Sequence, residues 1–133
     1  MRRLLDTNTC IKYLNGQSEA IRRHVEASFP SEIVVCAVVK AELFYGAYKS
    51  RYPERNLEKQ RLFLNRFASL SFDDHAAEMY GRIRADSERA GMPIGPNDLL
   101  IAAIALAHNV IVVTHNTREF ARIEDLRLED WET

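Results

Sequence analysis

The sequence has few of the features that mark secreted, membrane-spanning or nucleotide-binding proteins. Its only cysteines, Cys10 and Cys36, form no C-x-x-C motif, which favours two reduced thiols in a cytosolic protein over a disulfide or a zinc site. The longest apolar run, residues 99–107, is too short to cross a bilayer, and Asp6 ends the first apolar stretch before it could form a secretory signal. Neither G-x-G-x-x-G nor G-x-x-x-x-G-K-[ST] occurs, which disfavours nucleotide binding. We therefore expect a cytoplasmic protein that makes no membrane contact.

The composition is that of a folded domain without a strong charge bias. The chain has 133 residues, 47% of them hydrophobic, and its 18 Lys+Arg and 19 Asp+Glu give a formal net charge of −1. A chain of this length can bury a substantial core, and its near neutrality excludes neither an acidic nor a basic partner. Because the sequence shows no linker, repeat or low-complexity segment, we expect one domain over residues 1–133.

Short apolar runs alternate with helical patterns along most of the chain. The run from Leu99 to Ala107 is apolar on nearly all sides, which is typical of a central, buried helix. Alternating strands and helices predict an α/β fold with three layers, in which helices cover both faces of a central, mainly parallel sheet. Strands are predicted at residues 4–5, 33–35, 70–72 and 110–113, with an edge strand at 126–129.

Polar residues follow two of these predicted strands directly. Asp6 follows the first strand, and Thr114, His115 and Asn116 follow the strand at 110–113. Ligands of open α/β sheets bind at the carboxyl ends of the strands. Because a buried, unpaired carboxylate is costly, Asp6 must either face a cation or cap the helix that follows it.

Two further acids, Asp98 and Glu42, are candidates for the same site. Taken alone, Asp98 could simply cap the buried helix, and Glu42 could be a solvated residue of a mostly apolar helix. Several carboxylates at one strand-end crevice would repel one another and would need a cation. A set of oxygen ligands without cysteine or histidine favours Mg²⁺ or Mn²⁺ over zinc, and such sites most often serve phosphate chemistry.

Four sequence blocks resemble those of the PIN-domain nucleases, and most of all those of the VapC toxins of VapBC toxin–antitoxin pairs. Each block is weak alone, but four in this order across the whole chain are specific. The blocks are residues 4–8 (LLDTN), 40–47 (KAELFYGA), 94–103 (IGPNDLLIAA) and 113–120 (VTHNTREF), and residues 129–131 (EDW) close the chain.

The resemblance implies an acidic metal site. Asp6, Glu42 and Asp98 match the metal-binding acids of the family. Glu119 matches a fourth acidic position that is Asp in many members, and its longer side chain is expected to bind a second metal or to bind the metal through water. The implied cofactor is Mg²⁺ or Mn²⁺.

The resemblance also assigns polar neighbours to these acids. Thr7 and Asn116 match positions that would orient water or phosphate. His115 falls inside the fourth block, but a histidine in a turn is usually solvated, and we expect no direct catalytic role for it.

A metal-dependent endoribonuclease is the activity that the resemblance implies. Metal-activated water would hydrolyse an RNA phosphodiester, with tRNA and its anticodon stem–loop as the expected substrate, and leave a 5′-phosphate and a 3′-hydroxyl. The implied partners are a VapB-type antitoxin and a second copy in a homodimer. The alternative is a catalytically inactive PIN-like module that binds antitoxin or RNA. A haloacid-dehalogenase-like phosphotransferase is disfavoured because Asn8 stands where that family needs a second acid.

Basic and aromatic residues of the middle region are candidates for contacts with RNA or with partner proteins. Tyr45, Tyr48 and Tyr52 could stack bases or be buried against a partner, and Phe44, Tyr48 and Phe63 are predicted to form an exposed apolar face. We expect at least half of the basic candidates to be solvated and paired with nearby acids. These candidates are Arg22, Arg23, Arg51, Arg55, Lys59, Arg61, Arg82, Arg84 and Arg89.

Overall fold

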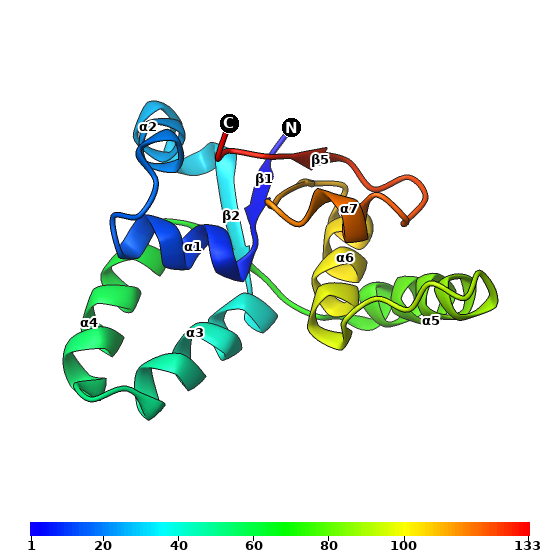
Figure 1. Cartoon of the computed structure of the whole chain (residues 1–133), viewed down its shortest axis with the longest axis horizontal. Helices are drawn as coiled ribbons and strands as arrows, with labels where there is room; N and C mark the ends of the chain where they lie inside the picture. The colour runs from blue at the N-terminus through cyan, green and yellow to red at the C-terminus, as the bar shows by residue number, and fades with distance from the viewer.

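The computed structural model describes residues 1–133 and contains one five-stranded, all-parallel sheet between two groups of helices (Figure 1). Helices α1 to α4 gather on one side of the sheet, and α5, α6 and α7 on the other. The strands are β1 (Arg3–Leu5), β2 (Ile33–Cys36), β3 (Ala68–Leu70), β4 (Ile111–Val113) and β5 (Leu128–Glu129). The helices are α1 (Thr7–Leu14), α2 (Glu19–Ala27), α3 (Ala37–Lys49), α4 (Pro53–Leu64), α5 (Asp74–Arg89), α6 (Pro96–His108) and α7 (Thr117–Phe120), with a 3₁₀ turn at Pro30–Glu32.

Strand order determines where a ligand can bind. The order is β3-β2-β1-β4-β5, so the chain leaves β1 toward β2 and β3 and later returns to the other side of β1 with β4. Leu4 of β1 lies opposite Val34 of β2 and Val112 of β4. Such a reversal of strand order opens a crevice at the carboxyl ends of the two strands, here β1 and β4. Asp6 and the turn at 114–116 both lie at this edge.

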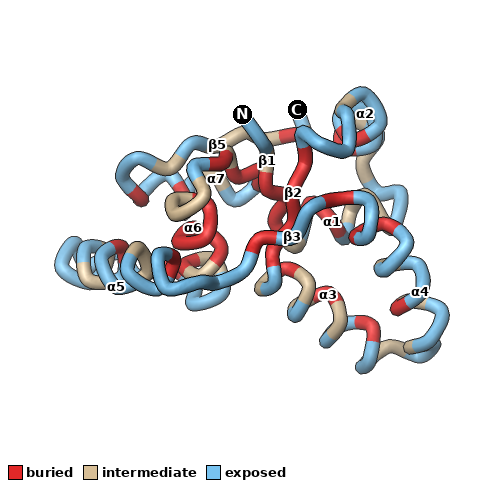
Figure 2. The backbone as a smooth tube through the Cα atoms, turned by 180° about the vertical axis from the view of Figure 1, so that it is seen from behind, coloured by how far each residue is buried: buried red, intermediate tan, exposed pale blue.

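The core surrounds the central strands, whose residues are buried on both faces of the sheet (Figure 2). This burial explains their continuous apolar runs, as expected for a parallel sheet. Helix α6 packs against this core, and its residues 101–105 are all buried. Asn109 ends α6 in the left-handed conformation, with φ 53°, and turns the chain into β4. The predicted α/β class and the central buried helix are therefore confirmed.

Two predictions about local structure are wrong. The third strand covers Ala68–Leu70 rather than residues 70–72, because its pairing with β2 places Leu70 opposite Cys36 and buries it. Phe72 lies beyond the sheet and packs edge-on against Tyr80 of α5. Phe63 is not part of an exposed face: it is buried, and its ring stacks on Tyr13 at 4.8 Å between centroids.

Fewer basic side chains on the surface form ion pairs than the sequence predicted. Only three of the nine basic candidates, Arg22, Arg84 and Arg89, form ion pairs with acids, each within its own helix. Cys10 and Cys36 are free and buried. None of the helices combines the length and the apolar character that crossing a bilayer requires.

Candidate functional site

Asp6 lies where β1 ends, and it caps α1. Its Oδ1 accepts a hydrogen bond of 2.9 Å from the backbone N–H of Thr9, and only 6% of the residue is exposed. Burial raises the pKa of the Asp6 carboxyl, while hydrogen bonds from Thr114 and Thr9 act in the opposite direction. Capping engages one carboxylate oxygen, so it does not exclude cation binding.

Glu42 is held at both of its carboxylate oxygens. The Thr7 hydroxyl at the start of α1 donates to Oε1 at 2.5 Å, and the Asn97 amide at the start of α6 donates to Oε2 at 3.0 Å. Three helices that are distant in sequence therefore meet at this half-buried carboxylate. The two contacts determine the direction in which Glu42 presents its charge.

Asp98 is the acid whose chemistry is most strongly changed by its surroundings. Burial raises its pKa to about 6, and the carboxylates of Glu119, Asp6 and Glu42 contribute to the same rise. Asn116 partly offsets these effects by donating to Asp98 Oδ2 at 3.4 Å. The fold therefore brings the other three predicted acids within electrostatic reach of Asp98.

Glu119 and Asn116 complete this group. The same Asn116 amide that reaches Asp98 also donates to Glu119 Oε2, at 3.3 Å. The other oxygen of Glu119 accepts a 2.7 Å hydrogen bond from the backbone N–H of Gly95, just before α6. The long side chain of Glu119 thus spans from α7 to the start of α6.

The four acids fit a divalent cation by their chemistry. None of them is within ion-pair distance of Lys, Arg or His, although such pairs occur at other acids of the chain. The atoms that they offer to a metal are all carboxylate oxygens, which hard ions such as Mg²⁺ prefer. No three of the four acids bring such atoms within 4.8 Å of one another. Hydrogen bonds from Thr7, Asn97 and Asn116 hold the side chains of Glu42 and Asp98 in place.

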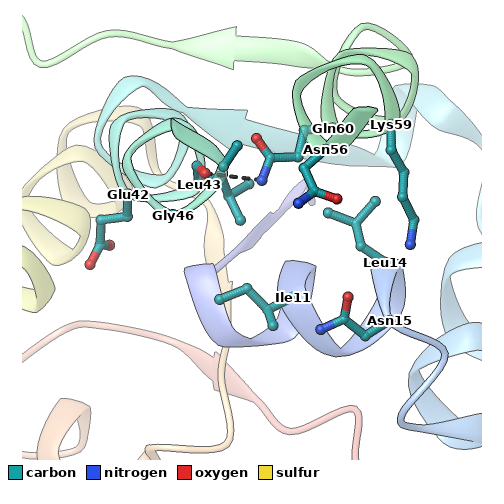
Figure 3. Close-up of a pocket in the computed structure, with 10 residues that line it drawn as sticks. Ile11, Leu14, Asn15, Glu42, Leu43, Gly46, Asn56, Lys59 and Gln60 are labelled. Atoms are coloured by element: carbon teal, nitrogen blue, oxygen red, sulfur yellow. Dashed lines mark hydrogen bonds between the residues drawn. The ribbon is translucent and has the colours of Figure 1, made fainter. Parts of the chain in front are cut away.

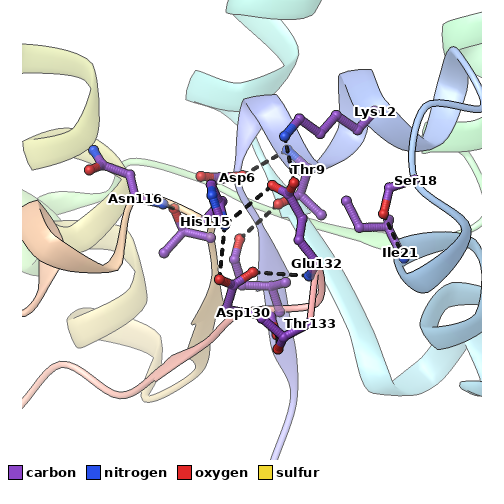
Figure 4. Close-up of polar contacts among 12 residues, drawn as sticks. Asp6, Thr9, Lys12, Ser18, Ile21, His115, Asn116, Asp130, Glu132 and Thr133 are labelled. Carbon is purple, nitrogen blue, oxygen red and sulfur yellow. Dashed lines mark hydrogen bonds and ion pairs between the residues drawn. The ribbon is translucent and has the colours of Figure 1, made fainter.

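His115 belongs to a separate polar network at the C-terminal end of the chain (Figure 4). Its Nδ1 lies 2.9 Å from Asp130 Oδ2 and 3.6 Å from Glu132 Oε2, and Lys12 pairs with Glu132 at 2.6 Å. The His115 side chain is 61% exposed. This network fastens the last residues to the turn after β4 and to α1.

One residue with a role at this site was missed from the sequence. Asn97 precedes Asp98 but reaches Glu42, a contact 55 residues away along the chain that no local pattern reveals. Thr114, which the sequence placed at this edge of the sheet, is buried, hydrogen-bonds to Asp6 and accepts from the backbone N–H of Asn116 at 3.0 Å.

Two hollows adjoin Glu42. A groove of about 250 Å³ lies between α1 and the α3–α4 hairpin, lined by Ile11, Leu14 and Leu43 among others (Figure 3). A larger cavity of about 690 Å³ shares Glu42 with it and also includes Thr7 and Asn97. The site is therefore open to a large ligand on the side of Glu42.

Comparison with known proteins shows full-length similarity to one family. The PIN domain family model matches residues 3–126. The chain is 43% identical over 128 residues, 96% of each chain, to the tRNA(fMet)-specific endonuclease VapC of Salmonella typhimurium. It is 38% identical over 130 residues, 97% of each chain, to ribonuclease VapC2 of Rickettsia felis. Among solved structures, DNA-bound VapBC from Salmonella typhimurium superposes with a TM-score of 0.92 at 42% identity, covering 98% of each chain. VapBC-1 from nontypeable Haemophilus influenzae gives a TM-score of 0.90 at 33% identity and covers both chains in full.

Proposed function

The chain belongs to the PIN-domain family and, within it, to the VapC toxin ribonucleases, and on that premise we propose that it cleaves tRNA with Mg²⁺ or Mn²⁺ as cofactor. One observation carries the proposal for the metal: three carboxylates, those of Glu119, Asp6 and Glu42, raise the pKa of Asp98, and none of the four acids pairs with a cationic side chain. The name of the Salmonella typhimurium relative, a tRNA(fMet)-specific endonuclease, supports tRNA as the substrate class.

We assign Asp6, Glu42 and Asp98 to hold the metal, with Glu119 next to them. When bound, such an ion lowers the pKa of a water molecule and neutralises charge on the phosphodiester. Asp98 must release its proton for this role, which its pKa of about 6 allows at neutral pH. The expected products are a 5′-phosphate and a 3′-hydroxyl.

The hydrogen-bonding neighbours position these acids. Thr7 and Asn97 fix the orientation of Glu42, and Asn116 holds Asp98 and Glu119 at a set separation. Preorganised ligands matter because small misplacements of reacting groups cost large factors in rate. We therefore include Thr7 and Asn116 in the catalytic machinery as positioning residues.

We also propose that one domain, residues 1–133, acts in the cytoplasm as a homodimer that a VapB-type antitoxin inhibits. The solved relatives from Salmonella typhimurium and Haemophilus influenzae are VapBC structures, which supports the antitoxin. The groove between α1 and the α3–α4 hairpin offers apolar walls for an antitoxin segment, and Glu42 at its border would attract a basic side chain.

Metal-dependent cleavage of tRNA tests this function. Purified chain, free of antitoxin, is incubated with total tRNA and Mg²⁺ or Mn²⁺, with EDTA and Asp6→Asn as negative controls. Asp86→Asn is the matched control, because Asp86 is an exposed acid of α5 paired with Arg89. Discrete fragments that disappear with EDTA and with Asp6→Asn, but persist with Asp86→Asn, are the expected result.

Intact tRNA in every reaction, with folded protein, would refute tRNA as the substrate. Ribosomal and messenger RNA would then be tested in the same way. If these also survived, an inactive module that binds RNA or antitoxin would replace the nuclease proposal.

A further inference from the structure

The cavity of about 690 Å³ beside the acids has a lining of two kinds. Thr7, Glu42 and Asn97 contribute polar groups of the acid site, while Val38 and Leu100 contribute apolar surface. Its volume lies in the usual range for small-ligand sites, roughly 300–1,000 Å³. A ligand that fills it should combine an apolar face with a group that can meet the acids, directly if it is cationic or through the metal of the proposed function if it is anionic. A nucleotide of a polynucleotide chain has this combination, because its base is apolar on both faces and its phosphate would meet the acids through that metal.

Tyr45 is the aromatic residue of this cavity. It follows Glu42 by three positions on α3, so both side chains lie on neighbouring parts of one helical face. The residue is 65% exposed, and its ring packs on no other aromatic ring of the chain. Lys49, one turn further along α3, places its Nζ 5.2 Å from the centre of the ring. Lys49 lies over one face of the ring, so a base can stack on the opposite face while the ammonium group meets a neighbouring phosphate.

We propose that Tyr45 is a stacking platform for an unpaired RNA base next to the phosphodiester that is cut. The proposal rests on the ribonuclease function above and adds to it a residue outside the acid site that contacts the substrate. The base must be unpaired because, in a duplex, both of its faces are already covered by neighbouring bases. Stacking accepts any base, so this contact selects single-stranded regions rather than a sequence.

The position of Tyr45 favours a nucleotide over a second copy of the chain in an active dimer. A second copy that covered this ring would also cover the cavity containing Thr7, Glu42 and Asn97, and would close the acid site to RNA. An inhibiting antitoxin would cover the same surface only in the inactive complex. Tyr48 provides the comparison, since it lies on the same helix and is also 65% exposed but does not line the cavity. The proposal therefore predicts that replacing Tyr45 weakens RNA binding and that replacing the equally exposed Tyr48 does not.

A binding assay separates this proposal from the ribonuclease function. The probe is a ten-nucleotide single-stranded RNA with one 2-aminopurine, whose fluorescence is quenched when the base stacks, and the fully paired duplex of the same sequence is the comparison. Binding is measured with the full chain in Ca²⁺, and a gel establishes that the RNA stays intact. The variants are Tyr45→Ala, Tyr45→Phe and Tyr48→Ala. Because no cleavage is needed, a protein that fails to cut tRNA can still pass this test.

The single strand should bind with quenching, and the duplex should not quench. Tyr45→Ala should weaken binding about tenfold and abolish the quenching, while Tyr45→Phe keeps both and Tyr48→Ala stays within about twofold. Unchanged binding by Tyr45→Ala, or equal losses for Tyr45→Ala and Tyr48→Ala, would overturn the proposal. A fall in molar mass for Tyr45→Ala by light scattering would also overturn it, because Tyr45 would then belong to a contact between copies.

Discussion

Replacing the acid Asp98 with its neutral amide should make the metal-free protein more stable. In the folded chain, burial and three neighbouring carboxylates raise the pKa of Asp98 from 3.8 to about 6. The folded state thus binds this proton more tightly than the unfolded state does. Its contribution to stability is complete below about pH 4 and is lost as the pH rises through 6. At pH 7.5 without metal, Asp98 therefore destabilises the fold, and Asp98→Asn removes that penalty.

The size of the effect follows from the pKa of Asp98. At about 1.4 kcal/mol per pKa unit, the rise from 3.8 to about 6 sets a ceiling of about 3 kcal/mol. Asp98 is only partly buried, so solvent screening reduces this value, and the carboxylate also loses a favourable position in the first turn of α6. We expect a net gain of roughly 1 kcal/mol at pH 7.5, or about 3 °C in Tm.

Urea denaturation in EDTA at pH 7.5 and pH 4.5 measures this gain. The difference between Asp98→Asn and the wild type should be largest at pH 7.5 and should shrink at pH 4.5, where the wild-type carboxyl is protonated in the fold. Asp86→Asn, which alters an exposed acid, should change the free energy of unfolding by less than about 0.5 kcal/mol. An Asp98→Asn protein that is less stable than wild type at pH 7.5 would refute this prediction, since burial and the neighbouring acids would then not penalise the charged form of Asp98.

Four further outcomes are expected. Mn²⁺ affinity, measured by calorimetry, should fall about tenfold from pH 7 to pH 5 because Asp98 must lose a proton with a pKa of about 6; an unchanged affinity would contradict this. Thr7→Val should lower the single-turnover cleavage rate at least tenfold by freeing Glu42, whereas Thr7→Ser should retain most of it, and equal rates would exclude a positioning role. Leu4→Ala, in the centre of the sheet, should cost about 3 kcal/mol in chemical denaturation; a loss below about 1 kcal/mol would mean that the core collapses around it. His115→Asn should leave the cleavage rate within about twofold, and a hundredfold loss would give this exposed residue a catalytic role.

Features that depend on short stretches of chain could be predicted from the sequence. Continuous β-branched runs predicted β2 and β4, and the apolar run after Asp98 predicted the buried helix α6, because each pattern reflects local burial. Asp6 at the end of a buried strand indicated the edge of the sheet that carries the site. The family resemblance named the other acids from their sequence blocks rather than from any physical pattern.

Features that depend on contacts between distant segments needed the tertiary structure. Pairing with β2 decided which residues form β3, and the packing of α4 against Tyr13 decided that Phe63 is buried. Thr7 reaches Glu42 across 35 residues, and Asn97 reaches it across 55.

The sequence by itself thus determined the order and kind of elements and the position of Asp6, because hydrophobic periodicity and strand ends are local properties. Only the tertiary structure decided that three other acids lie within electrostatic reach of Asp98, that Asn97 and Thr114 support them, and that Tyr45 rather than Tyr48 borders the cavity. The reason is physical: the pKa of Asp98 and the lining of a cavity depend on distances between helices, and those distances follow from packing around the whole core.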